Sequence, residues 1–493
     1  MEGRTESTSL VTPKKGYLRY AVAFTLLCGI IINYLIKVML SVAIVAMVKR
    51  QSSSSATNAT DNICPGQSND TEDTMEEGPF DWDTQIQGEI LSSYFYGYVA
   101  TQLLGGWIAD HFGGRWVFGP GLFATGVFSV LSPEAAKLDR YVFMALRALQ
   151  GVASGVLLPS ANVIIAKWFT LEERPRIAGF VLSASFGGTL ISMSLSGVLV
   201  DALGWSSVFY VFGGLSILFI LPWCYFVYNS PEVHPRISNW ERDHIVGGRT
   251  IDSSGTEDVK QEEEQVASRY TPWLSILTSH RFWVLVGVHL GCTWLNYTLL
   301  TQLPTYITSV LHFSVQKSGL ISSLPYLFGW ISAGLYGTLS SWLRNRGYLS
   351  QMNAYRVFTG IACVGPAISM LLIVLLGCDT VPIIACLIVT TVMLCAFYGG
   401  AVTQHLDIAP NYAGATTGIL YTTLNFAGII TPLVTGAILK GQETISGWHT
   451  VFYITIGMNL TPYIFYLLFA TDKEQSWNKP KMVKTENIIQ GAP

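Results

Sequence analysis

The chain has 493 residues, of which 32 are acidic and 29 basic, so 12% of the residues are charged whereas 50% are hydrophobic. This charge content is about half that of a typical soluble protein, and a water-soluble globule of this length could not bury so many apolar side chains. The composition argues against a soluble enzyme, a disordered protein and a nucleic-acid binder, and it predicts an all-α membrane protein.

A helix that crosses the hydrocarbon core needs about 20 mostly apolar residues. Twelve such runs follow one another along the chain, and we expect them to form two six-helix halves, residues 18–228 and 276–470. Residues 1–17 show no signal-peptide cleavage pattern and are predicted to be a cytosolic tail. Residues 229–275 are predicted to be a cytosolic linker, with a surface helix in the RISNWERDHIV segment, and residues 471–493 a cytosolic tail. The runs are 18–48, 87–110, 115–132, 141–165, 177–200, 207–228, 282–308, 318–341, 355–376, 380–402, 412–438 and 449–470.

The distribution of charge supports this orientation. Most lysines and arginines fall in segments that it places in the cytosol, as the positive-inside rule requires. The first outer loop, residues 49–84, is rich in acidic residues, and no Lys or Arg occurs from residue 51 to 114. The same loop contains two N-glycosylation motifs, so Asn58 and Asn69 are predicted to be glycosylated.

The two halves contain a repeat. Gly204-Trp205 and the later Val-Phe-Tyr at 208–210 recur as Gly447-Trp448 and the Val-Phe-Tyr at 451–453. Each copy lies across the last two apolar runs of its half. This pattern predicts a duplicated six-helix unit, with a binding site between two bundles that move relative to each other.

Two cations within the apolar runs are the main candidates for substrate binding. Lys37 lies in the first run, where Asn33 and Ser41 share its helical face, and Arg147 lies in the fourth. A charge at mid-bilayer costs about 3 kcal/mol on insertion scales unless it faces protein or water. Two interior cations without a nearby acid in the sequence favour an anionic ligand; the alternative is pairing with helix carbonyls or with an acid brought close by folding.

Other site residues are assigned from helix position. We expect Asn33, Tyr98, Gln102 and Tyr297 to line the binding site together with the two cations. Glu89, near the start of the second run, is the candidate acid for ion coupling, with a solvated interfacial position as the alternative. No nucleophile–base pair, phosphate-binding loop or metal-ligand spacing is present, so no enzyme activity, cofactor or metal is expected. Cys64 and Cys378 fall in outer loops, where they are either disulfide-bonded or free.

Several segments resemble known families. The string GGWIADHFGGR from Gly105 to Arg115 resembles the inner-loop signature of the major facilitator superfamily, which implies gating roles for Gly106, Asp110, Gly114 and Arg115. The stretch from Arg147 to Gly155 resembles its fourth-span RxxQGxxxG pattern. More narrowly, Leu40–Val48, Phe95–Ala109, Thr298–Ile307, Ser318–Leu327 and Gln404–Gly414 resemble the family of sialin, the vesicular glutamate transporters and the sodium–phosphate cotransporters.

This resemblance implies a secondary active transporter that moves sialic acid-like anions, acidic amino acids or phosphate by alternating access. Protons or sodium ions are the implied co-transported ions, and the partners are a small anionic solute and the lipid bilayer, with no nucleic acid. The resemblance implies a monomer in a lysosomal or vesicular membrane. An imperfect acidic dileucine signal from Glu6 to Val11 leaves the plasma membrane open.

The chain also departs from the family. Relatives usually carry Arg at the position of Lys37. The fourth-span acid linked to proton coupling falls at Ser154 here, and the second acid seen in sialin falls at Gln150. The histidine and the seventh-span arginine of the glutamate transporters correspond to Leu91 and Cys292, which disfavours glutamate. One hypothesis is that Lys37, facing Arg147, binds the coupled proton. The alternatives are uniport, sodium coupling, or a transporter-like sensor or anion channel without coupled transport.

Overall fold

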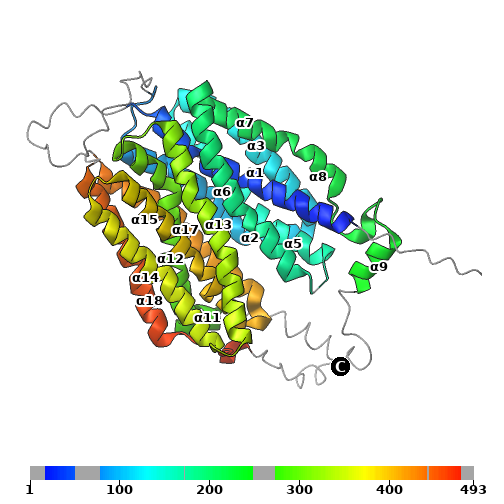
Figure 1. Ribbon diagram of the computed structural model, residues 1–493. Coiled ribbons are helices and arrows are strands. Elements are labelled where there is room, and N and C mark those ends of the chain that lie inside the picture. Colours follow the sequence, from blue (N-terminus) through cyan, green and yellow to red (C-terminus); the bar gives the residue numbers. More distant parts are fainter. Residues whose placement is uncertain (1–16, 50–77, 171, 248–271, 441–443, 479–493) are drawn as a thin grey trace, which may run out of the picture.

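The computed structural model describes residues 17–49, 78–170, 172–247, 272–440 and 444–478. The first half consists of helices that form six long rods, since α4 continues into α5 and α7 into α8 (Figure 1). Their bounds are α1 (Leu18–Met47), α2 (Thr84–Phe112), α3 (Gly114–Leu138), α4 (Arg140–Gly155), α5 (Leu157–Trp168), α6 (Arg174–Leu203), α7 (Ser206–Leu218) and α8 (Ile220–Phe226).

The second half again forms six rods. They are built from α12 (His280–Ser309), α13 (Val315–Asn345), α14 (Gln351–Leu376), α15 (Thr380–Leu394) with η2 (Cys395–Gly399), α17 (Ala413–Leu439) and α18 (Ile445–Phe469). Shorter elements lie at the predicted cytosolic end, which we call the inner end. They are η1 (Pro231–Val233), α9 (Asn239–Gly247), α11 (Trp273–Leu277), η3 (Ala401–Thr403), α16 (Gln404–Ile408), η4 (Pro410–Tyr412) and η5 (Ser476–Asn478).

The all-helical fold predicted from the sequence is confirmed, and every predicted apolar run coincides with a rod. Ten of the rods in the described residues meet the length and mean hydropathy needed to cross a membrane. The other two, α2 and α13, are 29 and 31 residues long but less apolar. Both contact the opposite half, since α2 packs along α17 and α13 packs along α6.

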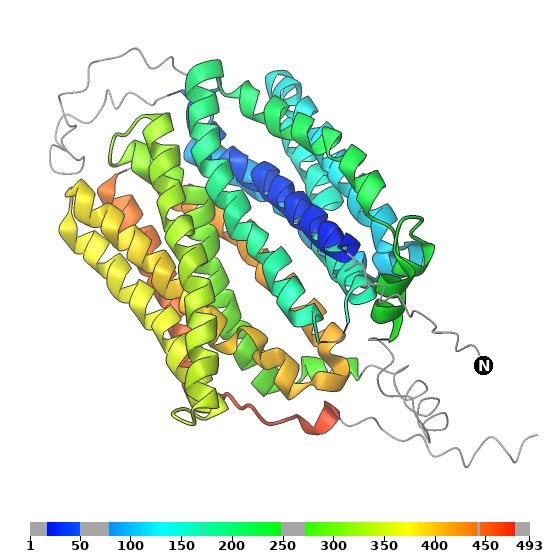
Figure 2. The same cartoon turned by 45° about the vertical axis from the view of Figure 1, so that its right-hand side comes forward.

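Each half has its own hydrophobic core. One core is made by side chains of α1 to α8, and the other by side chains of α12 to α18. A third, smaller cluster joins the halves and contains aromatic residues from both, including Tyr98 and Tyr297. Figure 2 shows the two groups of rods side by side.

The repeat in the sequence has a counterpart in the packing. The rings of Trp205 and Phe209 lie 6.1 Å apart in the first half, and those of Trp448 and Phe452 lie 6.3 Å apart in the second. The same ring pair therefore occurs at the start of the last rod of each bundle, as expected for a duplicated unit.

At the outer end the two halves are closed against each other through glycines. A β-carbon at Gly436 of α17 would lie 2.5 Å from the carbonyl oxygen of Thr84 in α2. A β-carbon at Gly319 of α13 would lie 2.6 Å from the carbonyl oxygen of Met193 in α6. Only hydrogen fits at these positions, so the helix backbones touch directly, as small residues permit between membrane helices.

Towards the inner end the halves separate. In the described residues, a polar contact across the interface joins Gln102 and Asn425, and an aromatic contact joins Phe186 and Tyr398. Towards the inner end, β-carbons at Gly179 of α6 and at Gly414 in the first turn of α17 would meet no heavy atom within 4 Å. In the described residues, the close backbone contacts between the halves therefore lie at the outer end, as an inward-facing arrangement requires.

Several predicted features lie outside the described residues: the glycosylation sites Asn58 and Asn69, Cys64, and the sorting signal beginning at Glu6. Cys378 is disulfide-bonded, and the other described cysteines are free. The pairing of Cys64 with Cys378 stays a prediction.

Candidate functional site

Lys37 is buried at the interface between the halves, with 8% of its surface exposed. Its ammonium group is surrounded by four aromatic rings, whose centroids lie 4.4 to 5.4 Å from Nζ. These rings belong to Tyr34 of α1, Phe95 and Tyr98 of α2, and Tyr297 of α12. Attraction between a desolvated cation and an aromatic face is worth about 2 kcal/mol. These four rings, which we call the aromatic cage, therefore compensate for only part of the hydration free energy that the ammonium group loses on burial.

A chain of hydrogen bonds links this ammonium group across the two halves. Lys37 Nζ donates to the hydroxyl of Tyr297 at 3.4 Å, and that hydroxyl donates to Asn425 Oδ1 at 2.6 Å. Asn425 Nδ2 in turn donates to Gln102 Oε1 at 2.6 Å. Helices α1, α12, α17 and α2 are thus joined in one polar network. A ligand that binds the ammonium group of Lys37 would compete with its hydrogen bond to Tyr297. It would thereby alter the contact between the two bundles.

Arg147 belongs to a second group, within the first half. Its exposed fraction is 1%. Its Nη1 donates to Gln150 Oε1 at 2.6 Å, and Gln150 Nε2 donates to the carbonyl of Thr125 at 3.2 Å. Arg147 Nε has no hydrogen-bond partner although it is buried. In the same half, Ser154 Oγ donates to Asn33 Oδ1 at 2.6 Å.

That Lys37 faces Arg147 stays a prediction, and the described contacts place the two cations on different rings of α2. Arg147 Cζ lies 5.0 Å from the ring of Tyr94, whereas Lys37 Nζ lies 4.4 Å from the ring of Tyr98. Those two rings are themselves stacked, with centroids 5.8 Å apart. The tyrosine pair occurs because residues four apart share one face of α2. Each cation contacts a different ring of this pair. The two charges are therefore members of separate polar groups.

Other predicted site residues are placed as follows. Tyr98, Gln102 and Tyr297 lie in the network around Lys37, and Asn33 lies beside Ser154. Glu89 lies near the outer end of α2, where its carboxylate accepts a hydrogen bond from Gln85 Nε2 at 3.3 Å. Its role in coupling stays a prediction, and in the described residues no hydrogen bond or ion pair joins it to the network.

The inner-loop segment is fixed to the first half by Arg115. Its backbone N–H donates to Asn229 Oδ1 at 3.1 Å, and its Nη2 donates to the carbonyl of Cys224 at 3.1 Å. The guanidinium carbon lies 3.9 Å from the ring of Tyr228. Gly113 makes the turn into α3 with φ of +88°, a conformation that favours glycine.

The other residues of this motif differ in their surroundings. A β-carbon at Gly114 would lie 2.6 Å from Ile164 Cγ1, so close packing of α3 on α5 requires glycine there. A β-carbon at Gly106 would make only an ordinary 4.0 Å contact with Pro159. Asp110 is exposed at the inner end of α2. Gating roles for these residues stay predictions.

The predicted linker helix is confirmed as α9, which docks on the first half. Glu241 is 1% exposed and accepts a hydrogen bond at 3.0 Å from the backbone N–H of Arg19, in the first turn of α1. The side chain of Arg19 forms a 3.1 Å ion pair with Glu173. A carboxylate at a helix N-terminus is stabilising, so the linker helps to cap α1.

His234 lies beside this region, between the rings of Trp168 and Tyr228. Its Nδ1 accepts a hydrogen bond at 3.1 Å from the backbone N–H of Arg236. Burial lowers the pKa of His234 below its ordinary value of 6.5. Protonation would remove the acceptor and place a charge close to Arg236.

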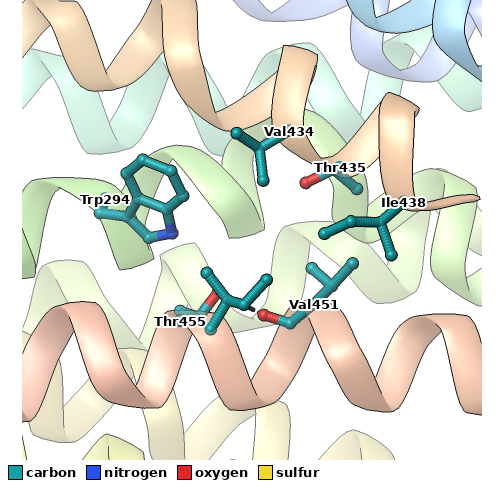
Figure 3. A pocket seen from close by; sticks show the side chains of 7 residues that line it. Trp294, Val434, Thr435, Ile438, Val451 and Thr455 are labelled. Carbon is teal, nitrogen blue, oxygen red and sulfur yellow. Dashed lines mark hydrogen bonds between the residues drawn. The ribbon is translucent and has the colours of Figure 1, made fainter.

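A narrow crevice, too small for a water molecule, lies in the second half between α12, α17 and α18 (Figure 3). It is lined by Trp294, Val434, Thr435, Ile438, Val451, Ile454 and Thr455. None of these was predicted as a site residue, and the lining contains no charged group. The crevice offers nothing to hold an anion, so it is not the candidate site.

The sequence analysis missed four residues at the site: Asn425, and the cage and stacking residues Tyr34, Phe95 and Tyr94. Asn425 had a usable signal, because it is a polar residue inside an apolar run. The three aromatic residues had none, since aromatic side chains in membrane helices usually pack or face lipid.

Comparison with known proteins agrees with this architecture. The sequence profile of the Major Facilitator Superfamily matches residues 26–432. The chain belongs to this superfamily. Members of the major facilitator superfamily are membrane transporters, so the chain is a multi-pass membrane transporter and not an enzyme.

The superfamily members most similar in sequence include human sialin and vesicular glutamate transporter 1 of Bos taurus. Sialin is 35% identical over 461 residues, which cover 93% of this chain and 90% of sialin. The glutamate transporter is 33% identical over 476 residues, covering 95% and 80% of the two chains. The narrower resemblance seen in the sequence is thereby confirmed.

Solved structures of the superfamily share the fold. A bacterial homolog of the human lysosomal transporter Spinster, in an inward-facing and unoccupied conformation, superposes with a TM-score of 0.69 at 13% identity, covering 93% of this chain and 99% of that one. A D-xylose–proton symporter gives a TM-score of 0.64 at 15% identity, covering 92% and 99%. The two-bundle major facilitator fold is confirmed.

Proposed function

We propose that this chain is a secondary active transporter of small organic or inorganic anions, and that Lys37 is the side chain that attracts the anion. The observation that carries the proposal is the position of Lys37. It is a buried ammonium group at the interface of two bundles, held by aromatic rings and one long hydrogen bond.

The charge balance supports this assignment. A buried charge is normally paired, and a bound anion would supply the counter-charge that the described residues do not. Arg147, over the ring of Tyr94, adds positive potential, while Tyr98, Tyr297 and Gln102 contribute polar contacts. The candidate solutes are sialic acid-like carboxylates, acidic amino acids and phosphate, in line with the names of the relatives.

Transport by alternating access requires an outward-facing state as well. The outer contacts between α2 and α17 and between α6 and α13 would have to separate, and the inner ends would have to close. We propose proton or sodium coupling for this cycle, with the protein acting as a monomer. A lysosomal or vesicular membrane is the proposed location, and the plasma membrane is the alternative.

The test is counterflow of labelled solute in liposomes that contain the purified protein. Labelled N-acetylneuraminic acid, glutamate, urate and inorganic phosphate are offered separately. Saturable counterflow of at least one is expected, together with its loss in Lys37→Gln and its weakening in Arg147→Gln. Lys137→Gln is the matched control, because Lys137 is exposed near the outer end of α3.

Three other outcomes contradict the proposal. Counterflow that survives neutralisation of both Lys37 and Arg147 would show that neither cation binds the anion. An ohmic current would indicate an anion channel. Saturable binding without either flux would indicate a transporter-like sensor.

A further inference from the structure

The distribution of carboxyl groups restricts where a coupled proton can bind. In the described part of the spanning helices, the acidic residues lie within about two turns of a helix end. They are Glu89 and Asp110 of α2, Glu134 of α3 and Asp201 of α6. Lys37, in contrast, is the twentieth residue of the 30-residue α1. No described carboxyl group of these helices lies at its level in the bundle.

The aromatic groups around the ammonium group of Lys37 come from three helices. Tyr34 comes from its own helix, Phe95 and Tyr98 from α2, and Tyr297 from α12. The tyrosines are neutral at ordinary pH. Arg147 lies 5.0 Å from the ring of Tyr94, which is stacked with that of Tyr98.

The hydroxyl of Tyr297 is oriented to accept from Lys37. Its own proton is used in the 2.6 Å hydrogen bond to Asn425 Oδ1, so the lone pairs remain for the Lys37 amine at 3.4 Å. This contact can be made by an ammonium group or by a neutral amine, since both carry N–H donors. The network does not require that Lys37 be permanently charged.

Lysine and arginine differ in this respect. Burial without a counter-charge favours the neutral form of an amine, whereas a guanidinium keeps its proton in proteins. An interface that holds lysine next to aromatic rings can therefore alternate between two protonation states, and one that holds arginine cannot.

We propose that Lys37 is itself the proton-coupling group of the transport cycle. This inference rests on the proposed function. The ammonium form binds a monovalent anion in the outward-facing state, and the ion pair passes to the inner side. There the anion leaves, the amine releases its proton to the cytosol, and the empty carrier returns with a neutral Lys37.

The step conserves atoms and charge. One N–H bond forms on the outer side and breaks on the inner side, and nothing is oxidised or reduced. The loaded pair and the empty site each carry no net charge at Lys37. Transport of a monovalent anion is therefore electroneutral, with one proton per anion.

The experiment separates exchange from net transport. The probe is whichever of N-acetylneuraminic acid, urate, glutamate and phosphate shows counterflow with the wild-type protein. Lys37→Arg is compared with Lys137→Arg, which changes an exposed lysine near the outer end of α3 in the same way. Counterflow, proton flux and net uptake are measured with a pH gradient, with the membrane potential clamped by valinomycin and potassium.

Wild-type protein and Lys137→Arg are expected to accumulate a monovalent probe about tenfold for each unit of pH gradient, independently of membrane potential. Lys37→Arg is expected to retain counterflow, because the loaded site is unchanged in charge. It should lose accumulation driven by the pH gradient, and any residual net uptake should respond to membrane potential, because the empty carrier must return with a positive charge.

Two results would overturn the inference without touching the proposed function. One is unchanged proton-driven accumulation in Lys37→Arg. The other is wild-type uptake that is driven by sodium or moves no proton. If Lys37→Arg is inactive in every assay, the wild-type measurements decide: one proton per monovalent anion without voltage dependence supports the inference. Absence of wild-type counterflow with all four probes would instead remove the proposed function.

Discussion

The substitution Gly436→Ala is expected to shift the protein towards the state in which the outer ends of its two halves are apart. The added β-carbon would lie 2.5 Å from the Thr84 carbonyl oxygen and 3.2 Å from Gln85 Cα, both in the backbone of α2. Ordinary van der Waals contact begins at 3.4 Å, so α2 and α17 must move apart by several tenths of an ångström. Backbone atoms cannot relieve such a clash by changing rotamer.

The cost of this overpacking is about 1–3 kcal/mol. This cost applies to the inward-facing state, in which the outer ends touch. It is absent from the outward-facing state, in which they are apart. The equilibrium between the two states should therefore shift about 5- to 150-fold towards outward-facing. Replacing glycine by alanine within a helix also stabilises the helix by about 1 kcal/mol through intrinsic propensity. The control must therefore be another Gly-to-Ala substitution in a helix.

The assay is thiol labelling from the outer side. Ser92 is fully buried in α2 and donates to the carbonyl of Ile429 in α17 at 2.8 Å, so Ser92→Cys reports separation of these helices. The labelling rate by a membrane-impermeant methanethiosulfonate should rise by the same factor. Gly457→Ala is the control, because a β-carbon there meets no atom within 4 Å. Equal rates in Gly436→Ala and Gly457→Ala would refute the reasoning.

Three further predictions concern other parts of the molecule. Tyr297→Phe removes the acceptor for Lys37 and leaves the buried amide of Asn425 without its donor, so binding of the probe anion should weaken by about 1–3 kcal/mol in a titration. Tyr326→Phe should have little effect on the same titration, since the buried hydroxyl of Tyr326 has no hydrogen-bond partner. Because the pKa of His234 is lowered in the folded protein, stability should be highest above pH 6.5 and fall as the pH drops towards the lowered pKa; thermal unfolding of His234→Asn should lack this component. Gly113→Ala should lower the melting temperature in the same assay at every pH, because it forces a side chain into a backbone with φ of +88° and against Asn229.

The polar residues inside apolar runs show how far the sequence can identify a site. Lys37, Arg147 and Asn33 were found because charged and amide groups are costly in a membrane, and all three are buried. The partners of these residues were not found. The contacts between residues 37 and 297 and between residues 102 and 425 join segments that are far apart in the chain. A single sequence does not show which distant segments come close together in space.

The sequence by itself determined the membrane class, the positions of the twelve rods and the duplication of the two halves. These follow from local composition and periodicity, because a bilayer requires each crossing helix to satisfy its own backbone. Only the tertiary structure decided that Lys37 is caged at the interface, that Arg147 belongs to a separate group, and that the outer end is closed. Those outcomes depend on how helices pack, and packing is set by the shapes of side chains from both halves together.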